Sequence, residues 1–278
     1  MLFDLLGKGY FPHELPPPFN THSYGACFGN PPTIPSHLRK PPKAELVAHN
    51  LARAGRLRRR LSIPNPFHHL RLSELIEQNW TAINAHCQMS TISKSKPSLK
   101  PKSKRAIMRE YEFDDLPAFR ASTRAVSRYV LITDIANYYS SLYTHSIPWA
   151  IHTKAVAKTN RSHSLYGNVL DQVVRSGQDE QTGGIPISPD SSFVLSEIVL
   201  TSIDLSLNEK TATNGFRYMD DYELGFETLS QAEEALAILQ SVLHEYDLQL
   251  NQSKTSILPL PDVIERPWIS ELRKKQSN

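Results

Sequence analysis

Three acidic residues stand where carboxylates could carry out chemistry. Asp134 ends the β-branched run YVLITD, and Asp220 and Asp221 separate two short strand-like runs, FRYM and YELGF. If these strands are neighbours in one sheet, the three carboxylates meet at one edge. Clustered carboxylates repel one another unless cations neutralise them, and two Mg²⁺ ions about 3.5–4 Å apart suit in-line nucleotidyl transfer. The alternative for Asp220 and Asp221 is a plain turn, because aspartate is common in turns.

A second set of residues could bind phosphate. Residues 94–109 contain no acidic residue and seven basic ones: Lys94, Lys96, Lys100, Lys102, Lys104, Arg105 and Arg109. Such charges on a loop rich in Pro and Ser can hold a triphosphate or a nucleic-acid backbone. The alternative is a solvated loop without a ligand. Further along, three arginines four residues apart predict a basic stripe on one helix: Arg120, Arg124 and Arg128.

Charge is divided unevenly along the chain. Residues 1–128 hold 20 Lys and Arg against 9 Asp and Glu, whereas residues 129–278 hold 11 against 19. A basic half can neutralise phosphates and an acidic half can hold divalent cations. Two solvated faces of opposite sign that attract each other are the alternative.

Composition excludes several classes of protein. Apolar residues make up 40% of the chain and charged residues 21%, as in globular proteins rather than disordered chains. The sequence has no run of 18 apolar residues and no secretory signal, so we expect no membrane contact. Two cysteines form neither a disulfide framework nor a cysteine zinc site, and no zinc-type histidine spacing or P-loop is present. We therefore expect a reduced, cytoplasmic protein.

The second half of the chain predicts the sheet that would position the carboxylates. The run YVLITDI is typical of a strand, and the two runs around Asp220-Asp221 are typical of a hairpin. A last strand is expected near 256–258. Helices are expected between these strands, so the order predicts an α+β fold.

Two helices complete this prediction. The first starts at 188–190, with Ser188 as its cap and Pro189 in its first turn, and continues as a largely apolar helix over 193–207. The second follows a capping box of Ser230 and Glu233. Its apolar face is formed by Leu236, Leu239, Leu243 and Tyr246.

The first half of the chain is less regular. Its first 42 residues contain 9 of the 20 prolines, which predicts an extended or irregular segment wrapped over the rest. From Leu72 to Cys87 the apolar residues have helical spacing. Residues 90–105 are rich in Ser, Lys and Pro and are expected to form an exposed loop.

The residues around the carboxylates resemble the catalytic motifs of reverse transcriptases. The similarity includes Tyr218-Met219-Asp220-Asp221 and the spacing of Tyr139 five residues after Asp134. Two further motifs follow in the order typical of the family: QTGGIP at 181–186 before a helix, and LNQSKT at 250–255. Four ordered motifs extend the resemblance over about residues 50–260.

The resemblance implies a role for each matching acidic residue. Asp134 and Asp220 would be the main ligands of two Mg²⁺ ions, which Mn²⁺ could replace. The carbonyl of Ile135 would add an oxygen, and Asp221 would help to hold the metals or the primer end. The substrates would be dNTPs, and the partners RNA or DNA.

Other matching residues would contact the nucleotide. Tyr139 would be the steric gate that leaves no room for a 2′-hydroxyl, with core packing as its alternative. Gln181 would contact the incoming nucleotide, and Gly183 and Gly184 would let the backbone approach it, unless they form only a flexible turn. Lys254 would protonate the leaving pyrophosphate, or is a surface lysine. We expect three basic residues to lie nearest the triphosphate: Lys104, Arg105 and Arg109.

Segments such as GGIPISPDSS and IPNP are similar to the abortive-infection and unknown-group bacterial reverse transcriptases, which are associated with phage defence. This resemblance implies RNA-templated or template-independent DNA synthesis, in some members primed by a tyrosine such as Tyr10 or Tyr24. A retron- or group II intron-like enzyme is one alternative. A catalytically silent nucleic-acid-binding palm subunit is another, although the intact carboxylates favour an enzyme.

The resemblance predicts the fingers and palm of a right-hand polymerase, with an antiparallel palm sheet backed by helices. We expect an N-terminal extension over 1–50, basic fingers over 51–128, a palm over 129–258 and a tail over 259–278. The tail is too short for a helical thumb, so either the chain is a fragment of a longer protein or its thumb is absent or truncated. A partner chain or a second copy would then supply a thumb-like part.

Overall fold

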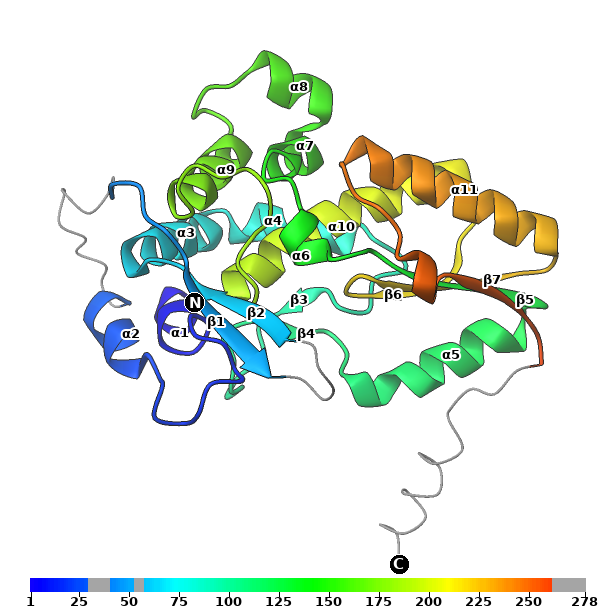
Figure 1. Ribbon diagram of the computed structural model, residues 1–278, viewed down its shortest axis with the longest axis horizontal. Helices are drawn as coiled ribbons and strands as arrows, with labels where there is room; N and C mark the ends of the chain where they lie inside the picture. The colour runs from blue at the N-terminus through cyan, green and yellow to red at the C-terminus, as the bar shows by residue number, and fades with distance from the viewer. Residues whose placement is uncertain (30–40, 53–57, 262–278) are drawn as a thin grey trace, which may run out of the picture.

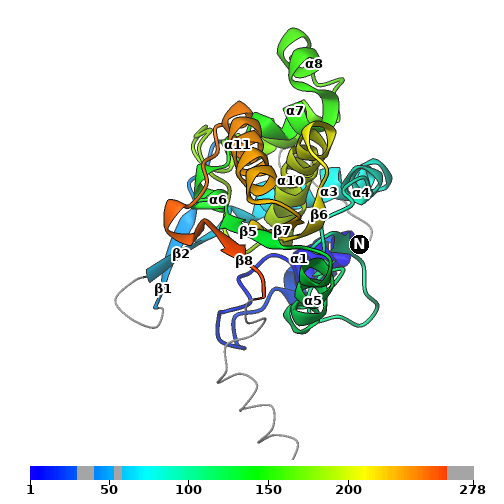
Figure 2. The same ribbon diagram turned by 90° about the vertical axis from the view of Figure 1, so that its right-hand side faces the viewer.

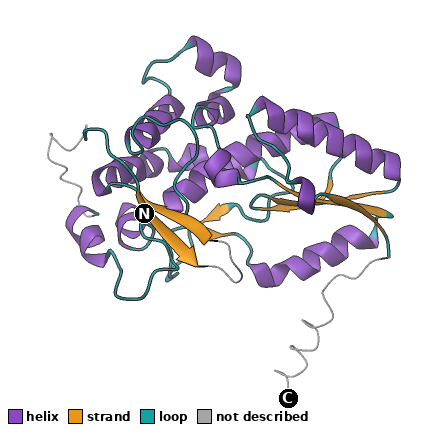
Figure 3. Cartoon of the chain, viewed as in Figure 1, coloured by secondary structure: helices purple, strands orange, loops and turns teal. Residues whose placement is uncertain are grey.

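A four-stranded antiparallel sheet forms one side of the molecule in the computed structural model, which describes residues 1–29, 41–52 and 58–261 (Figures 1 and 3). The strands lie in the order β6, β7, β5, β8. Their bounds are β5 Tyr129–Asp134, β6 Asn214–Tyr218, β7 Asp221–Phe226 and β8 Ser256–Pro259. The expected strand, hairpin and last strand are thus confirmed, and with them the α+β fold.

Helices cover both faces of this sheet, as Figure 2 shows. Helices α10 (Asp190–Lys210) and α11 (Leu229–Glu245) pack on one face, and α5 (Leu116–Ala125) packs on the other. Side chains alternate between the faces along β7: Leu224 joins the core with α10 and α11, whereas Glu223 meets α5.

The rest of the described chain is mainly helical and lies beside the sheet (Figure 1). Its helices are α1 Leu2–Gly7, α2 His22–Phe28, α3 Pro66–Gln78, α4 Trp80–Gln88, α6 Tyr138–Ser141, α7 Ser146–His152, α8 Lys154–Thr159 and α9 Tyr166–Ser176. Two small hairpins accompany them, formed by β1 Val47–Ala52 with β2 Arg58–Ile63 and by β3 Pro97–Ser98 with β4 Met108–Arg109. Short 3₁₀ turns lie at η2 Phe113–Asp115 and η3 Gln252–Lys254.

The N-terminal segment differs from the prediction. Instead of an irregular wrap, it forms α1 and α2, and the side chains of Leu2, Leu5 and Leu6 are buried. Four of the prolines lie between these helices, so apolar residues at helical spacing before them still fold. The C-terminal tail beyond Pro261 lies outside the described residues.

Three local predictions were also wrong. The helix expected from Leu72 to Cys87 is divided at Asn79, whose side chain donates to the carbonyl of Leu75 at 2.8 Å and ends α3. The capping box of α11 is formed by Thr228 and Gln231, two residues earlier than expected.

Helix α10 starts at Asp190, with Pro189 as its N-cap and no side-chain hydrogen bond from a cap. Ser188 therefore does not cap it. None of the helices in the described part of the chain has the length and apolar character that crossing a bilayer requires.

Candidate active site

The pairing of β5 with β7 brings the acidic residues together. Asp134, the last residue of β5, is directly opposite Asp221, the first residue of β7. The backbone N–H of Ile135 donates to the carbonyl of Asp220 at 3.1 Å, which places the third acidic residue beside the end of β5. The sheet therefore gathers the three predicted carboxylates at one edge.

The turn between β6 and β7 lies one residue earlier than predicted. Asp221 pairs with Tyr218 across the hairpin as well as with Asp134, so it belongs to the strand. Met219 and Asp220 form the turn, and Met219 has a left-handed backbone with φ of 57°. A non-glycine residue in this region is strained and needs support from its surroundings.

Buried polar groups supply that support. Ser95 Oγ accepts a hydrogen bond from the backbone N–H of Met219 at 2.8 Å, and the guanidinium of Arg217 donates to the Met219 carbonyl at 2.8 Å. Arg217 is fully buried and forms ion pairs with Glu197 at 2.9 Å and Asp204 at 2.8 Å. Both backbone groups of Met219 are thus held by a charged network inside the fold.

Sequence reasoning missed this network. Residues 90–105 were expected to form an exposed loop, but Ser90, Ser93 and Ser95 are buried and donate to the carboxylates of Asp204 and Glu197. The available signal was two acidic residues within the apolar helix 193–207, because buried carboxylates require partners.

Burial and mutual repulsion perturb the acidic residues. Burial raises the pKa of Asp220, and Asp134 adds to this rise, while Lys254 and Arg59 oppose it. Burial, then Asp220 and Asp134, raise the pKa of Asp221 to about 6. Carboxyls that hold protons so readily are ones that a cation would stabilise.

Lys254 lies against the same group. Its ammonium donates to Oδ2 of Asp134, and this hydrogen bond raises the pKa of Lys254. The other oxygen of Asp134, Oδ1, is buried and has no hydrogen-bond partner among the described residues. An unpartnered buried carboxylate oxygen is costly in a folded protein, so a missing ligand is expected there.

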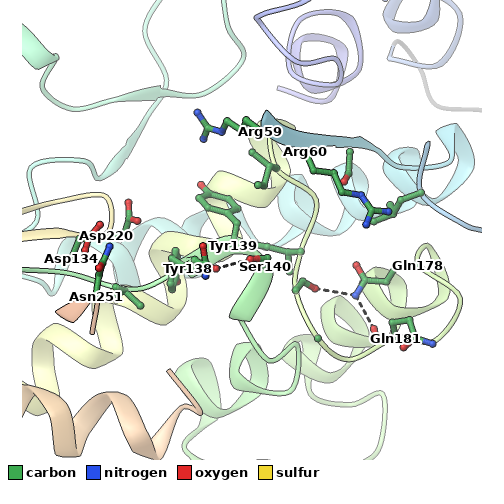
Figure 4. Close-up of a pocket in the computed structure, with 18 of the residues that line it drawn as sticks. Arg59, Arg60, Asp134, Tyr138, Tyr139, Ser140, Gln178, Gln181, Asp220 and Asn251 are labelled. Atoms are coloured by element: carbon green, nitrogen blue, oxygen red, sulfur yellow. Dashed lines mark hydrogen bonds between the residues drawn. The ribbon is translucent and has the colours of Figure 1, made fainter. Parts of the chain in front are cut away.

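These groups line a large open cavity of about 1020 Å³. In Figure 4, Asp134 and Asp220 lie at one side, with Tyr139 between them and the arginines of β2. The predicted residues among its lining are Asp134, Ile135, Tyr139, Gln181, Gly183, Gly184, Asp220, Asp221 and Lys254. Sequence reasoning missed three others, Arg58, Arg59 and Arg60, although their run of positive charge was visible.

Comparison with known proteins identifies the family. Residues 63–267 match the family model of the reverse transcriptase (RNA-dependent DNA polymerase). This chain belongs to the reverse transcriptase family. Among proteins with curated descriptions, no sequence matches it.

Solved structures support the fold of a reverse transcriptase. The chain is similar to telomerase from Candida albicans in complex with a fragment of telomeric RNA, with 10% identity, a TM-score of 0.52, and coverage of 83% of this chain and 44% of that one. It is also similar to apo telomerase from Candida tropicalis truncated from its C-terminal domain, with 12% identity, a TM-score of 0.50, and coverage of 79% and 50%. The chain thus spans about half the length of these telomerase chains and has a polymerase fingers and palm fold.

In this reverse transcriptase, Tyr139 lies on helix α6 rather than on a strand end. Its neighbour Tyr138 is buried and donates to the carbonyl of Ser196 at 2.9 Å. Tyr139 is half-buried and lines the cavity, and its carbonyl accepts from the N–H of Ile185 at 2.8 Å. Tyr138 belongs to the core, and Tyr139 packs against that core as well as lining the cavity, so both interpretations of Tyr139 stay open.

The loop with the two glycines has a defined shape. Gly184 has φ of 82°, and a Cβ built there would lie 3.0 Å from the carbonyl oxygen of Ser140, whereas a Cβ on Gly183 would meet nothing within 4 Å. Buried Gln178 holds the loop by donating to the carbonyls of Gln181 at 2.7 Å and Gly184 at 2.9 Å (Figure 4). Sequence reasoning also missed Gln178.

The basic residues of 94–109 do not line the cavity. Arg105 is paired with Asp190 at 2.6 Å and donates to the carbonyls of Phe11 and Ser188, so its guanidinium is bound away from the cavity. Arg109 packs beside the catalytic turn, with its Nε 3.3 Å from Sδ of Met219, and Lys104 is exposed outside the cavity lining. The structure supports none of these three as a nucleotide ligand.

The predicted arginine stripe also has another role. Arg120 and Arg124, on α5, both bind the carboxylate of Glu223 on the sheet, at 3.1 and 2.9 Å. Arg128 lies beyond the end of α5. The first two therefore neutralise a buried acid rather than forming an open basic surface.

The three acidic residues could bind divalent cations, but they do not form a complete metal site from protein ligands alone. In the ranges that the structure describes, no three His, Cys, Asp or Glu side chains are grouped as a metal site. The unpartnered Oδ1 of Asp134 and the raised pKa values of Asp220 and Asp221 nevertheless fit a cation. Mg²⁺ is commonly held by one or two carboxylates together with substrate phosphates and water, which agrees with such an open site.

Proposed function

We propose that this reverse transcriptase adds dNTPs to a primer end by two-metal nucleotidyl transfer. The observation that carries the proposal is the pairing of Asp134 with Asp221 beside Asp220, at the edge of a cavity with arginines on its lining. Asp134, Asp220, Asp221 and the carbonyl of Ile135 would hold the cations. Bound Mg²⁺ would activate the attacking hydroxyl and stabilise charge on the leaving pyrophosphate.

The arginines of β2 are suited to the triphosphate. Arg58, Arg59 and Arg60 line the cavity, and Arg59 is near enough to Asp220 to oppose the rise of its pKa. Figure 4 shows Arg60 on the other side of Tyr139 from Asp134 and Asp220, whereas Arg59 lies above the Tyr139 ring. Guanidinium groups bind phosphate oxygens through paired hydrogen bonds, so these arginines replace the lysine and arginines expected from 94–109.

The remaining lining residues would select the nucleotide. The ring of Tyr139 would lie against the sugar and exclude a 2′-hydroxyl. Gln181, Gly183 and Gly184 would present the loop to the nucleotide and template. Lys254 contacts Asp134 in the structure. When the substrate binds, the ammonium of Lys254 would leave Asp134 and donate a proton to the pyrophosphate.

The biological setting that we propose is cytoplasmic phage defence, with RNA-templated or template-independent DNA synthesis. Its support is the similarity of GGIPISPDSS and IPNP to the abortive-infection and unknown-group enzymes. Tyr10 and Tyr24 are poor candidates for a protein primer, because their hydroxyls donate to the carbonyls of Pro64 and Pro66 at 2.5 Å and burial raises their pKa values.

The test is Mg²⁺-dependent dNTP incorporation by the wild type and Asp220→Asn, with and without an RNA template. A polymerase loses incorporation in Asp220→Asn because the substitution removes a cation-binding charge. Electrophoresis before and after protease digestion shows whether the product is attached to protein.

Asp247→Asn is the matched control. Asp247 is exposed and has φ of 58°, a conformation that asparagine adopts readily, and it does not line the cavity. Incorporation that survives in Asp220→Asn would refute the proposal. Nucleic-acid binding without incorporation in the wild type would instead support a silent palm subunit.

A further inference from the structure

A second hollow lies next to the loop at 181–184. Its volume is about 440 Å³, and helices α7, α8 and α9 with their connecting loops surround it (Figure 1). Tyr143, which lines this hollow, forms a bridge with Gly183, which lines the catalytic cavity. The next residue, Thr144, donates from its backbone N–H to the carbonyl of Thr182 at 2.9 Å. One loop therefore separates the two hollows.

The charge around this hollow is positive although the second half of the chain is acidic. Residues 135–170 contain Lys154, Lys158, Arg161 and three histidines but no Asp or Glu. Among the described residues that line the hollow, Asp171 is the one acid. Its carboxylate is bound by Nδ1 of His145 at 2.7 Å and by Arg175 at 3.2 Å, so it is already neutralised.

Several donors in the hollow have no acidic partner. Within the described ranges, Lys158 and Arg161 form no ion pair, and the side chain of Gln172 makes no hydrogen bond. Both basic residues are exposed. A surface that gathers unpaired cations and an amide in one hollow is suited to phosphate oxygens.

Aromatic rings complete the hollow. The ring of Tyr143 lies edge-on to Trp149, with 5.5 Å between their centroids, and both residues are partly exposed. The ammonium of Lys158 lies 5.8 Å from the centroid of the Trp149 ring. Aromatic rings among basic groups are the usual means of binding unpaired bases together with their phosphates.

We infer that this hollow binds a single-stranded segment of the nucleic acid that occupies the catalytic cavity. Lys158 and Arg161 bind its phosphates, and Tyr143 and Trp149 contact its bases. Ser140 lines the cavity and Tyr143 lines the hollow. These two residues are three positions apart, so their Cα atoms are at most about 11 Å from each other. A strand that leaves the cavity past Gly183 therefore reaches the hollow directly. The inference rests on the proposed function for the source of the strand.

The test is fluorescence anisotropy of labelled hairpin duplexes with and without a single-stranded tail, at several salt concentrations. It uses the full chain without dNTPs or divalent cations, and tails of RNA and of DNA. The variant is Lys158→Ala/Arg161→Ala. Loss of two phosphate contacts is expected to reduce the slope of log K against log salt by about 1.4, which makes the affinity loss between 50 and 200 mM salt about sevenfold smaller.

The matched control is Lys8→Ala/Arg71→Ala, which removes the same charge from the N-terminal helices. Lys8 pairs with Asp4 and Arg71 with Glu74, each on its own element. The inference predicts that the control binds the tailed hairpin like the wild type. It also predicts that the Lys158/Arg161 variant binds tailed and blunt hairpins alike.

Failure of this inference can be separated from failure of the proposed function. Asp220→Asn should still prefer the tailed hairpin, and the Lys158/Arg161 variant should still extend a primer on a template whose overhang is too short to reach the hollow. An unchanged salt slope in the Lys158/Arg161 variant, or an equal loss in the control, would overturn the inference. A competition experiment gives a further outcome against the inference. If polyglutamate released the tailed hairpin from the wild type as readily as an oligonucleotide does, the hollow would be a site for acidic peptides.

Discussion

The ammonium of Lys254 is bound to Oδ2 of Asp134, while Oδ1 of the same carboxylate is buried without a partner. Lys254 is 62% exposed and so can leave Asp134 when substrate and cations arrive. The pairing links the residue proposed as proton donor directly to a residue proposed as metal ligand.

Lys254→Met is expected to lower the rate of dNTP incorporation by about 10²-fold, because it removes the acid for the leaving pyrophosphate. Binding of Mn²⁺ to the free protein should become tighter, since no ammonium competes for Asp134. Single-turnover incorporation and calorimetric titration with Mn²⁺ measure the two effects. Lys254→Arg keeps the charge but is a poor acid, so it should lower the rate without tightening Mn²⁺ binding; a normal rate in either variant contradicts the role.

Arg217→Met is expected to destabilise the fold by about 3–5 kcal/mol, because it leaves the buried carboxylates of Glu197 and Asp204 uncompensated. Urea unfolding gives the change in free energy. The control Lys210→Met removes an exposed pair with Glu245 and should cost less than about 1 kcal/mol. A combined Arg217→Met, Glu197→Gln, Asp204→Asn variant should recover part of the loss, and no recovery would argue against the ionic origin of the effect.

Stability without metal is expected to depend on Asp221. Its pKa is raised by folding to about 6, so the folded state holds the proton more tightly than the unfolded state. This contribution stabilises the fold at low pH and is lost as the pH rises through about 6. Thermal unfolding in chelator should therefore show a smaller pH dependence between 5 and 7.5 in Asp221→Asn than in the wild type.

Mg²⁺ competes with that proton. The increase in melting temperature on adding Mg²⁺ should be larger at pH 7.5 than at pH 5.5, because the carboxyls are ionised at the higher pH. Equal increases at both pH values would show that these carboxyls do not bind the ion.

Gly184→Ala is expected to cost about 1–2 kcal/mol or more, because alanine is strained at φ of 82° and its Cβ would lie 3.0 Å from the carbonyl oxygen of Ser140. Gly183→Ala is the neighbouring control, since its Cβ would enter open space. Urea unfolding of the two variants should separate them, and the KM for dNTP should rise in Gly184→Ala. Equal stability of the two variants would mean that the loop shape is not required.

Tyr139→Ala is expected to admit ribonucleotides, and the preference for dNTP over NTP should fall at least about tenfold. Competition between dNTP and NTP in single-nucleotide addition measures this preference. Tyr139→Phe keeps the ring and should keep the preference. Selectivity that is unchanged in Tyr139→Ala would assign the steric gate to another residue.

The local sequence was enough to predict which acidic residues meet at the sheet edge and which strands present them. Asp134, Asp220 and Asp221 were found because motif spacing and strand periodicity are local properties, and β5, the β6–β7 hairpin and β8 lie where the pattern predicts. The register of the β6–β7 hairpin could be predicted only to within one residue. The position of its turn depends on Asp221, which pairs with Tyr218 on β6 and with Asp134 on β5.

Which charged side chains pair with one another depends on the tertiary fold. Arg105 and Arg59 both belong to basic segments, yet Arg105 is bound to buried Asp190 whereas Arg59 lines the cavity. Arg217 and Ser95 support Met219 from positions 122 residues apart in the chain, a contact that no local pattern reports. The physical reason is that a buried charge takes the partner that folding brings to it, and composition does not reveal that partner.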